Sequence, residues 1–209
     1  MTDPSTRDHW NRVYSTKQDA EVSWFEPSPE QSVRMLDAAG LTPLSCVVDI
    51  GGGNSRLVDH LLDRGLTCLT VLDVSSAVLE SARVRLGDRA SVPLWVEADV
   101  TGDWSIPPVD IWHDRAVFHF LTTADARTRY VEHLLESVKP GGRVVMATFA
   151  LDGPEKCSGL PVARYSPETL AETLGPELTL VESIAWRHAT PFGTAQSFQY
   201  SIFRRALRV

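Results

Sequence analysis

The chain lacks the features that mark membrane, secreted and metal-binding proteins. No apolar run approaches the roughly 20 residues of a membrane span, and the polar N-terminus shows no secretory signal. Only three of the 209 residues are cysteines, Cys46, Cys68 and Cys157, and no two of them have metal-ligand spacing. Cys46 and Cys68 border predicted core strands. We therefore expect buried thiols, a reducing cytoplasm and no metal site.

Positive charge is also scarce. The chain has 20 Lys and Arg against 27 Asp and Glu, which gives a net charge of −7. Binding to nucleic acid needs a positive field, so this balance argues against a nucleic-acid partner. The length and the 43% apolar content indicate one globular domain over residues 1–209. We expect a helical cap at 1–40, a core at 45–150, and a substrate-side loop, short helix and hairpin at 151–209.

The most informative stretch begins at Val47. Residues 47–50 are typical of a strand covered on both faces, and the three glycines that follow, residues 51–53, predict a turn that leads into a helix with an apolar stripe. A turn without Cβ atoms lets a ligand approach the backbone beside the free N–H groups of the helix. Glycine turns also serve packing, so this stretch alone leaves both a bound cofactor and a packing role open.

Strands and helices alternate through the rest of the core. Further strands are predicted at residues 67–73, 92–98, 109–113 and 143–149, with helices between them. This alternation predicts a parallel sheet with helices on both faces. Two later runs with period two predict an antiparallel pair, at residues 178–186 and 198–202. The expected fold is therefore α/β, a doubly wound sheet of seven strands, mostly parallel with an antiparallel C-terminal pair.

Two connecting segments lack such periodicity. The sequence Lys139-Pro140-Gly141-Gly142 is expected to end the preceding helix sharply, and residues 152–163 are expected to form an irregular loop.

Carboxylates stand at or near the ends of three successive predicted strands. They are Asp49, Asp73 and Asp99. In an open doubly wound sheet, the carboxyl ends of the strands line one crevice where ligands bind. Asp73 follows the glycine turn by about 20 residues, the spacing at which a carboxylate receives ribose hydroxyls. A nucleoside is the implied ligand.

The glycine turn limits which nucleoside is expected. A dinucleotide fingerprint has glycine at its first, third and sixth positions, and here Gly51 and Gly53 fill the first two. The sixth position is Arg56, whose long side chain stands where helix and strand should touch closely. This argues against nicotinamide and flavin dinucleotides. No Gly-Lys-Ser/Thr follows, so the phosphate-binding Walker pattern is also absent.

Four segments in order resemble the class I S-adenosylmethionine-dependent methyltransferases. They are Val-Val-Asp-Ile-Gly-Gly-Gly at 47–53, Val-Leu-Asp-Val at 71–74, Glu-Ala-Asp-Val at 97–100 and Val-Lys-Pro-Gly-Gly-Arg at 138–143. The closing hairpin is similar as well. The N-terminal His-Trp-Asn-Arg-Val-Tyr, together with Ser-Trp-Phe, resembles a subset with small-molecule methyltransferases and some protein-lysine methyltransferases. The Asn/Asp-Pro-Pro-Tyr/Phe motif of nucleobase and glutamine methyltransferases is missing, because His113-Asp114-Arg115-Ala116 occupies its position.

The resemblance implies a role for each matching residue. The turn at 51–53 would hold the methionine part of the cofactor, and Asp49 would support the turn or meet the amino group. Asp73 would take the ribose hydroxyls and Val74 would lie against adenine. The resemblance also places the Asp114 region beside the transferred methyl. The implied cofactor residues are Asp49, Gly51, Gly52, Gly53, Asp73, Val74, Asp99, Val100 and Asp114, with S-adenosylhomocysteine as the product.

Residues for acceptor binding and catalysis are less clearly marked. A general base is needed only where the acceptor must lose a proton. The catalytic candidates are Asp114, His113 and Arg115, and further bases considered are His119, Tyr165 and His188. The substrate candidates are Trp24, Phe25, Tyr14, His119, Cys157 and Tyr165.

Each candidate also has a structural interpretation. Trp24 and Phe25 form a lid over the ligand or fasten the N-terminal helices. The ring of His119 packs between two phenylalanines, and His188, at a strand end, is expected to be solvated. Arg115 binds an anion or pairs with Asp114. An incidental loop cysteine explains Cys157.

The sequence thus predicts a cytoplasmic methyltransferase that acts on a small molecule. One alternative is a protein-lysine methyltransferase, for which a protein would be the partner. Another is a non-catalytic module that binds the cofactor or a partner and has lost the chemistry.

Overall fold

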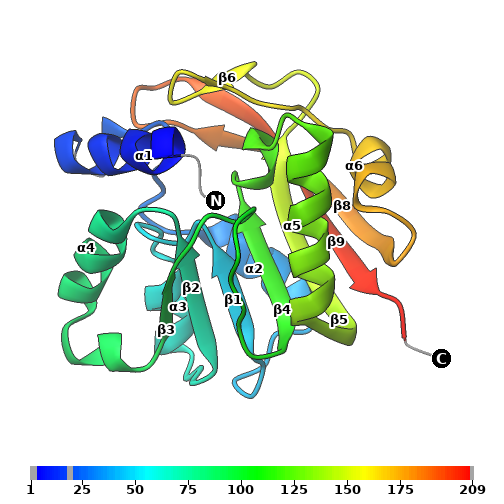
Figure 1. Ribbon diagram of the computed structural model, residues 1–209, viewed down its shortest axis with the longest axis horizontal. Coiled ribbons are helices and arrows are strands. Elements are labelled where there is room, and N and C mark those ends of the chain that lie inside the picture. Colours follow the sequence, from blue (N-terminus) through cyan, green and yellow to red (C-terminus); the bar gives the residue numbers. More distant parts are fainter. Residues whose placement is uncertain (1–3, 18–20, 208–209) are drawn as a thin grey trace.

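The computed structural model describes residues 4–17 and 21–207. Seven strands form one sheet in the order β3-β2-β1-β4-β5-β9-β8 (Figure 1). The strands are β1 Val47–Ile50, β2 Leu69–Asp73, β3 Leu94–Glu97, β4 Val109–Arg115, β5 Val138–Phe149, β8 Leu178–Ala189 and β9 Ala195–Arg205. The pairs among β1 to β5 are parallel, whereas β9 is antiparallel to both β5 and β8. The predicted doubly wound fold with an antiparallel C-terminal pair is confirmed.

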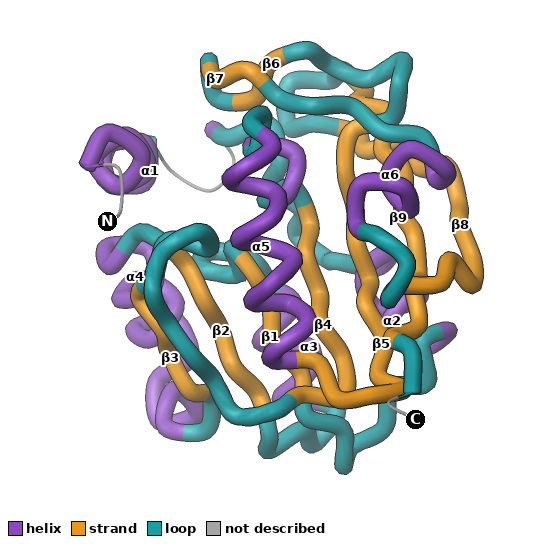
Figure 2. The backbone as a smooth tube through the Cα atoms, turned by 45° about the vertical axis from the view of Figure 1, so that its right-hand side comes forward, coloured by secondary structure: helices purple, strands orange, loops and turns teal. Residues whose placement is uncertain are grey.

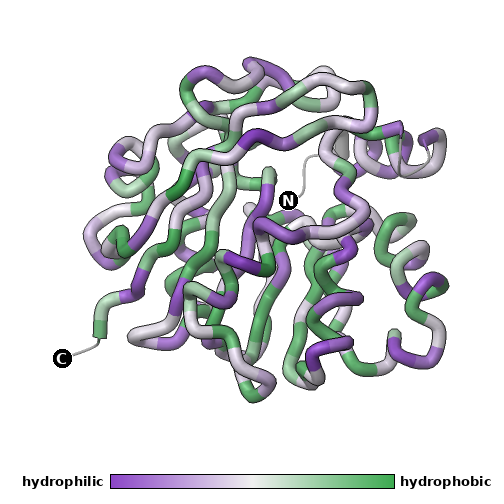
Figure 3. The backbone as a smooth tube through the Cα atoms, turned by 180° about the vertical axis from the view of Figure 1, so that it is seen from behind, coloured by the Kyte–Doolittle hydropathy of each residue, from purple (hydrophilic) through white to green (hydrophobic). Residues whose placement is uncertain are grey.

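Helices cover both faces of the sheet (Figure 2). They are α1 Pro4–Thr16, α2 Glu30–Ala38, α3 Leu57–Asp63, α4 Ser76–Leu86, α5 Ala124–Ser137 and α6 Pro167–Leu174. Apolar residues of α2, α3 and α4 pack on one face, and those of α5 and α6 pack on the other. Side chains alternate between the faces of a strand, so Val47 belongs to the first core and Val48 to the second. Hydrophobic residues follow the central strands in Figure 3.

Local chemistry sets several helix starts. Ser75 accepts a hydrogen bond from the Val78 N–H, and Thr123 accepts one from Ala126. Ser166 and Thr169 form a capping box at the start of α6. The first cap starts α4 just after the end of β2, which carries Asp73, and the second starts α5 after the segment that follows β4.

The two connecting segments differ from expectation. Helix α5 does end at Ser137, but residues 138–142 belong to β5, because Val138 pairs with Val109 before the register shifts. The predicted irregular loop contains a short hairpin of β6 Lys156–Cys157 and β7 Leu160–Pro161. This hairpin lies at the same end of the sheet as α1 (Figure 1).

The expectation of buried thiols at positions 46 and 68 is wrong. Cys46 and Cys68 form a disulfide, and Cys68 is exposed. Parallel pairing of β1 and β2 places Val47 opposite Leu69, so the preceding residues of the two strands are neighbours. Spacing along the sequence could not reveal this contact. Cys157 is a free, buried cysteine. In the described residues, every helix is too short or too polar to cross a bilayer.

The disulfide should stabilise the fold measurably. A crosslink between residues 22 apart lowers the entropy of the unfolded chain by an amount worth about 3 kcal/mol. Replacing both Cys46 and Cys68 by serine should therefore lower the free energy of unfolding by about that amount. Urea denaturation with and without reductant measures it. Reductant should leave the stability of the double variant unchanged, and an equal stability of the oxidised wild type and the variant would contradict the expectation.

Candidate functional site

A cavity of about 450 Å³ lies at the carboxyl ends of the central strands. One part of its lining contains the acidic strand ends, and the other part is aromatic and apolar. The residues used below are Trp10, Tyr14, Trp24, Gly51, Asp73, Val74, Asp99, Val100, Arg115, Ala116, Val117, Phe120, Cys157, Leu160 and Pro161. A smaller cavity of about 60 Å³ adjoins it and shares Tyr14, Trp24, Gly51 and Arg115 with it.

The glycine turn is built for close approach to the backbone. Gly51 has a φ of +65°, and its N–H donates to the Leu72 carbonyl at 2.7 Å. A Cβ at Gly51 would meet the Val117 side chain at 2.2 Å, and one at Gly52 would meet Asp49 Oδ2 at 2.4 Å. Side chains at these positions would therefore displace the residues that form the wall of the cavity.

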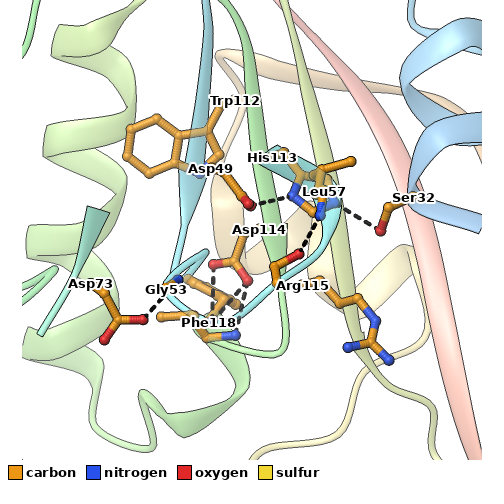
Figure 4. A network of polar contacts seen from close by, with 12 residues as sticks. Ser32, Asp49, Gly53, Leu57, Asp73, Trp112, His113, Asp114, Arg115 and Phe118 are labelled. Atoms are coloured by element: carbon orange, nitrogen blue, oxygen red, sulfur yellow. Dashed lines mark hydrogen bonds and ion pairs between the residues drawn. The ribbon is translucent and has the colours of Figure 1, made fainter. Parts of the chain in front are cut away.

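Asp49 is buried at the end of β1 with one oxygen unsatisfied. His113 on the neighbouring strand β4 contacts Asp49 Oδ1 through Nδ1 at 2.7 Å, and its Nε2 contacts Ser32 Oγ at 3.0 Å (Figure 4). Asp49 Oδ2 has no hydrogen-bond partner and lies beside Gly52 in the small cavity. A buried carboxylate oxygen without a partner is costly, so this oxygen is suited to a ligand donor such as an ammonium group.

Asp73 is held in place by two backbone amides. The Gly53 N–H donates to Oδ2 at 3.2 Å and the Ser75 N–H donates to Oδ1 at 2.9 Å. Burial nevertheless raises the pKa of Asp73 to about 6. Asp99, just beyond β3, accepts bonds from the Thr101 N–H and hydroxyl, both at 2.8 Å. Both carboxylates line the large cavity, as do Val74 and Val100.

Asp114 has a different environment from the one expected beside a transferred methyl. It is fully buried and lines neither cavity. The Tyr130 hydroxyl donates to it, and it accepts from the Val117 N–H at 2.9 Å and the Phe118 N–H at 3.1 Å. Asp114 thus holds the turn after β4, where Ala116 has a φ of +70°. Its contacts indicate a positioning role.

Arg115 pairs with Glu26, so the alternative in which it pairs with Asp114 is wrong. Its Nη2 lies 2.9 Å from Glu26 Oε1, Nη1 donates to the Trp24 carbonyl at 3.0 Å and Nε donates to the Tyr200 hydroxyl at 3.2 Å. The Glu26 and Arg115 side chains are both 14% exposed. Arg115 thereby anchors the Trp24 segment over the sheet.

The expectation of a solvated His188 is also wrong. This residue is buried, with Nε2 2.8 Å from the Ser23 carbonyl and Nδ1 3.2 Å from Glu26 Oε1. Glu26 comes from a segment far away in the sequence, so no local pattern could have revealed the contact.

The remaining candidates divide between the cavities and the core. Tyr14 and Trp24 line both cavities, Phe25 lines the small one and Cys157 lines the large one. Burial raises the pKa of the Cys157 thiol to about 12.

His119 and Tyr165 line neither cavity. His119 is fully buried against Phe149, and burial lowers its pKa to about 3. Tyr165 is in the α5 and α6 core.

Sequence reasoning missed several lining residues. Trp10 packs edge-on against Trp24 and Phe120, with ring centroids 5.7 and 5.3 Å away. Tyr14 stacks on Trp10 at 6.0 Å. Trp10 was marked only by the His-Trp-Asn motif of the N-terminal helix. No pattern in the sequence marked Phe120, and its neighbour His119 was the candidate residue in this segment.

Comparisons with known proteins identify the family. Residues 48–144 match a family model described as a methyltransferase domain. This range contains the glycine turn, Asp73 and Asp99, which contribute to the lining of the cavities, and the buried Asp114. This match, together with the fold, supports a class I S-adenosylmethionine-dependent methyltransferase family for the chain.

Relatives of this methyltransferase are distant in sequence. EEF1A lysine methyltransferase 2 of Danio rerio is 23% identical over 194 residues, which cover 86% of this chain and 77% of that protein. The N-methyltransferase NodS of Bradyrhizobium japonicum, solved with S-adenosylhomocysteine, has a TM-score of 0.71 at 20% identity, covering 96% of this chain and 98% of that one. A structure concerning conversion of a disulfide into a thioacetal in echinomycin biosynthesis has a TM-score of 0.75 at 19% identity, with coverages of 98% and 94%. The structural likenesses show the fold.

The residues of this methyltransferase fit the family's cofactor. The unsatisfied Asp49 oxygen suits an ammonium, the backbone at Gly51 and Gly52 lines the cavities, and the Asp73 and Asp99 oxygens suit hydroxyl and amino donors. Three carboxylates of different accessibility thus face one connected site.

Proposed function

We propose that the chain transfers a methyl group from S-adenosylmethionine to a small-molecule acceptor by in-line displacement. The observation that carries the proposal is the division of one large cavity into an acidic part and an aromatic part. Asp73 and Asp99 are the carboxylates of its lining, and they belong to the nucleoside side. The remaining lining residues contribute Arg115 as a charged group and no carboxylate, so a neutral or anionic acceptor suits them better than an ammonium.

Each residue has a proposed binding role. Asp49 Oδ2 accepts from the cofactor amino group, and the 51–53 backbone supports the methionine part. Asp73 accepts from the ribose hydroxyls, Val74 lies against adenine, and Asp99 accepts from the adenine amino group with the Val100 N–H nearby. Trp10, Tyr14, Trp24 and Phe120 surround the acceptor.

The protein's contribution to the reaction is chiefly alignment. The bound cofactor supplies a sulfonium methyl that is already electrophilic. Holding two reactants in a near-attack geometry contributes on the order of 7–11 kcal/mol in good cases. The aromatic rings fix the plane of an acceptor and exclude water, and the Asp114-supported turn fixes the wall between acceptor and cofactor. Among the described residues that line the aromatic part there is no carboxylate, and burial raises the pKa of Cys157 to about 12, so an acceptor that is already a nucleophile suits this site.

The aromatic cluster also supports a second candidate. Four aromatic residues around a site attract a cation, and the Danio rerio relative is named as a lysine methyltransferase. Turnover of labelled S-adenosylmethionine with a metabolite extract and with a protein extract separates the two. We expect product with the metabolite extract. Label in the protein extract alone would favour lysine methylation, and no label in either, with cofactor binding intact, would favour a non-catalytic module.

Thermal shift gives the first test of the cofactor assignment. S-adenosylhomocysteine at 100 times its Kd should raise the free energy of unfolding by about 2.7 kcal/mol. NAD, which the Arg56 position argues against, serves as the control and should have no effect. A response to NAD alone would contradict the proposal.

Cofactor affinity should also depend on pH. Burial raises the pKa of Asp73 to about 6, and ribose hydroxyls donate best to its ionised form. Binding therefore favours the carboxylate, so affinity should be constant above this pKa and fall as the pH drops below about 6. Calorimetric titration with S-adenosylhomocysteine between pH 5 and pH 8 measures the effect. Asp73→Asn, which has no charge to lose, should bind with a reduced affinity that does not change with pH, and a wild-type affinity that rises toward pH 5 would contradict the assignment.

A further inference from the structure

A buried charge cluster lies beneath the aromatic part of the large cavity. It contains two cationic side chains, Arg115 and His188, and one carboxylate, Glu26. A single oxygen, Glu26 Oε1, faces both partners, at 2.9 Å from Arg115 Nη2 and 3.2 Å from His188 Nδ1. The Glu26 side chain is 14% exposed and that of His188 is 3% exposed, so water screens these charges weakly.

The hydrogen bonds of His188 require its charged form. Its Nδ1 faces a carboxylate oxygen and its Nε2 faces the Ser23 carbonyl at 2.8 Å. Both oxygens only accept, so both ring nitrogens must donate. A neutral imidazole has one donor and would point a lone pair at one of the oxygens. His188 is therefore an imidazolium in this arrangement.

Arg115 has hydrogen-bonding capacity that its protein partners leave unused. Arg115 lines both cavities, and its Nη2 is fully buried without a hydrogen bond of good geometry, even though it lies in ion-pair range of Glu26. The groups that act most strongly on its charge are Tyr200, Glu26 and Cys157. Burial raises the pKa of Cys157 to about 12 and that of Tyr200 above its ordinary value, so both are neutral. Glu26 is then the ionised partner that two cations share.

The cluster therefore carries one excess positive charge beside the aromatic lining. An unpaired buried charge is costly, and a ligand anion in the cavity would compensate it. Asp49 already holds His113, and its second oxygen faces the glycine turn. We propose that the methyl acceptor is a small aromatic carboxylate, whose anionic group lies against the Arg115 guanidinium while its ring lies among Trp10, Tyr14, Trp24 and Phe120. This inference rests on the proposed function and names its substrate class.

The test compares matched acids and amides in the presence of S-adenosylhomocysteine. The probes are indole-3-acetate against indole-3-acetamide, and 4-hydroxybenzoate against 4-hydroxybenzamide. A hydrogen-bonded charge pair contributes enough for the acid of at least one pair to bind about 10- to 100-fold more tightly than its amide. Calorimetry gives both affinities. No preference for the acid in either pair overturns the proposal.

Variants assign the preference to Arg115. Arg115→Gln should abolish it, and Arg115→Lys should retain part of it. If Arg115→Gln does not fold, Glu26→Gln provides the second test: removal of the shared carboxylate leaves more positive charge, so the acids should bind more tightly than they do to the wild type. Weaker acid binding by Glu26→Gln, or an acid preference that survives in Arg115→Gln, contradicts the proposal.

A control separates the acceptor from the cofactor's own carboxylate. S-adenosylhomocysteine carries that carboxylate, whereas 5′-methylthioadenosine lacks the amino-acid end. If Arg115 serves the acceptor, Arg115→Gln should leave the ratio of the two nucleoside affinities unchanged. Selective loss of S-adenosylhomocysteine binding would assign Arg115 to the cofactor and overturn the inference, while the methyltransferase proposal would stand. Failure of the wild type to bind either nucleoside would instead defeat the proposed function.

Discussion

Replacing Asp73 by alanine should weaken binding of S-adenosylhomocysteine by at least about 100-fold, because two hydrogen bonds to a charged acceptor contribute about 1.5–3 kcal/mol each. The Asp73 carboxylate is 5% exposed and faces the large cavity. Strand β2 has no other carboxylate that could replace it. Titration calorimetry measures the change. In a thermal shift at 100 times the wild-type Kd, the response should fall from about 2.7 to about 0.4 kcal/mol.

The stability of the Asp73→Ala variant should differ little from that of the wild type. The substitution leaves the Gly53 and Ser75 amides without their side-chain acceptor, but it also removes a buried carboxylate whose pKa is raised to about 6 by desolvation. Asp73→Asn keeps an acceptor oxygen for these amides and should bind the ligand with intermediate affinity. Undiminished binding by Asp73→Ala would remove the ribose assignment, and with it the main support for an adenosyl site.

Replacing Asp114 by alanine should lower the free energy of unfolding by about 3–5 kcal/mol, the usual cost of removing one partner from a buried polar network. The substitution leaves the Tyr130 hydroxyl and the Val117 and Phe118 amides without their acceptor in a site that water does not reach. Denaturation in urea measures this loss. Asp114→Asn, which retains an acceptor oxygen, should lose less.

The same pair of variants tests the catalytic hypothesis for Asp114. A general base contributes about 10²- to 10⁴-fold to the rate. If Asp114 only supports the turn after β4, folded Asp114→Asn should retain kcat within about tenfold of wild type, a loss smaller than that of a base. Tyr130→Phe removes the hydroxyl that donates to Asp114, and its effects on stability and kcat should be similar. A kcat reduced by three orders of magnitude in Asp114→Asn alone would restore the catalytic role.

The edge of the sheet that carries the three carboxylates was predictable because it depends on local chemistry. Asp49, Asp73 and Asp99 are marked by apolar runs that end in a carboxylate, and a parallel sheet brings such ends together whatever the details of packing. The glycine turn was predictable for the same reason, since a Cβ at position 51 or 52 would clash with a neighbouring side chain.

The failures concern partners that are distant in the sequence. Glu26 meets Arg115 and His188 across separations of 89 and 162 residues, and nothing near any of the three indicates the others. The Cys46–Cys68 bond follows from strand register, which no spacing rule encodes. The catalytic hypothesis for Asp114 followed its position in the family pattern, and the sequence did not indicate its contact with Tyr130, which belongs to α5.

The position of β9 has a consequence for how the chain is made. Residues 195–205 follow every other strand in the sequence, yet they lie between β5 and β8 and supply the only neighbour that β8 has in the seven-stranded sheet. During synthesis, β8 leaves the ribosome before its partner strand β9, and β5 presents an open side until β9 arrives. Completion of the sheet must therefore wait for the last strand to be translated, and a chaperone that shields β5 and β8 in the interval would raise the yield of folded protein.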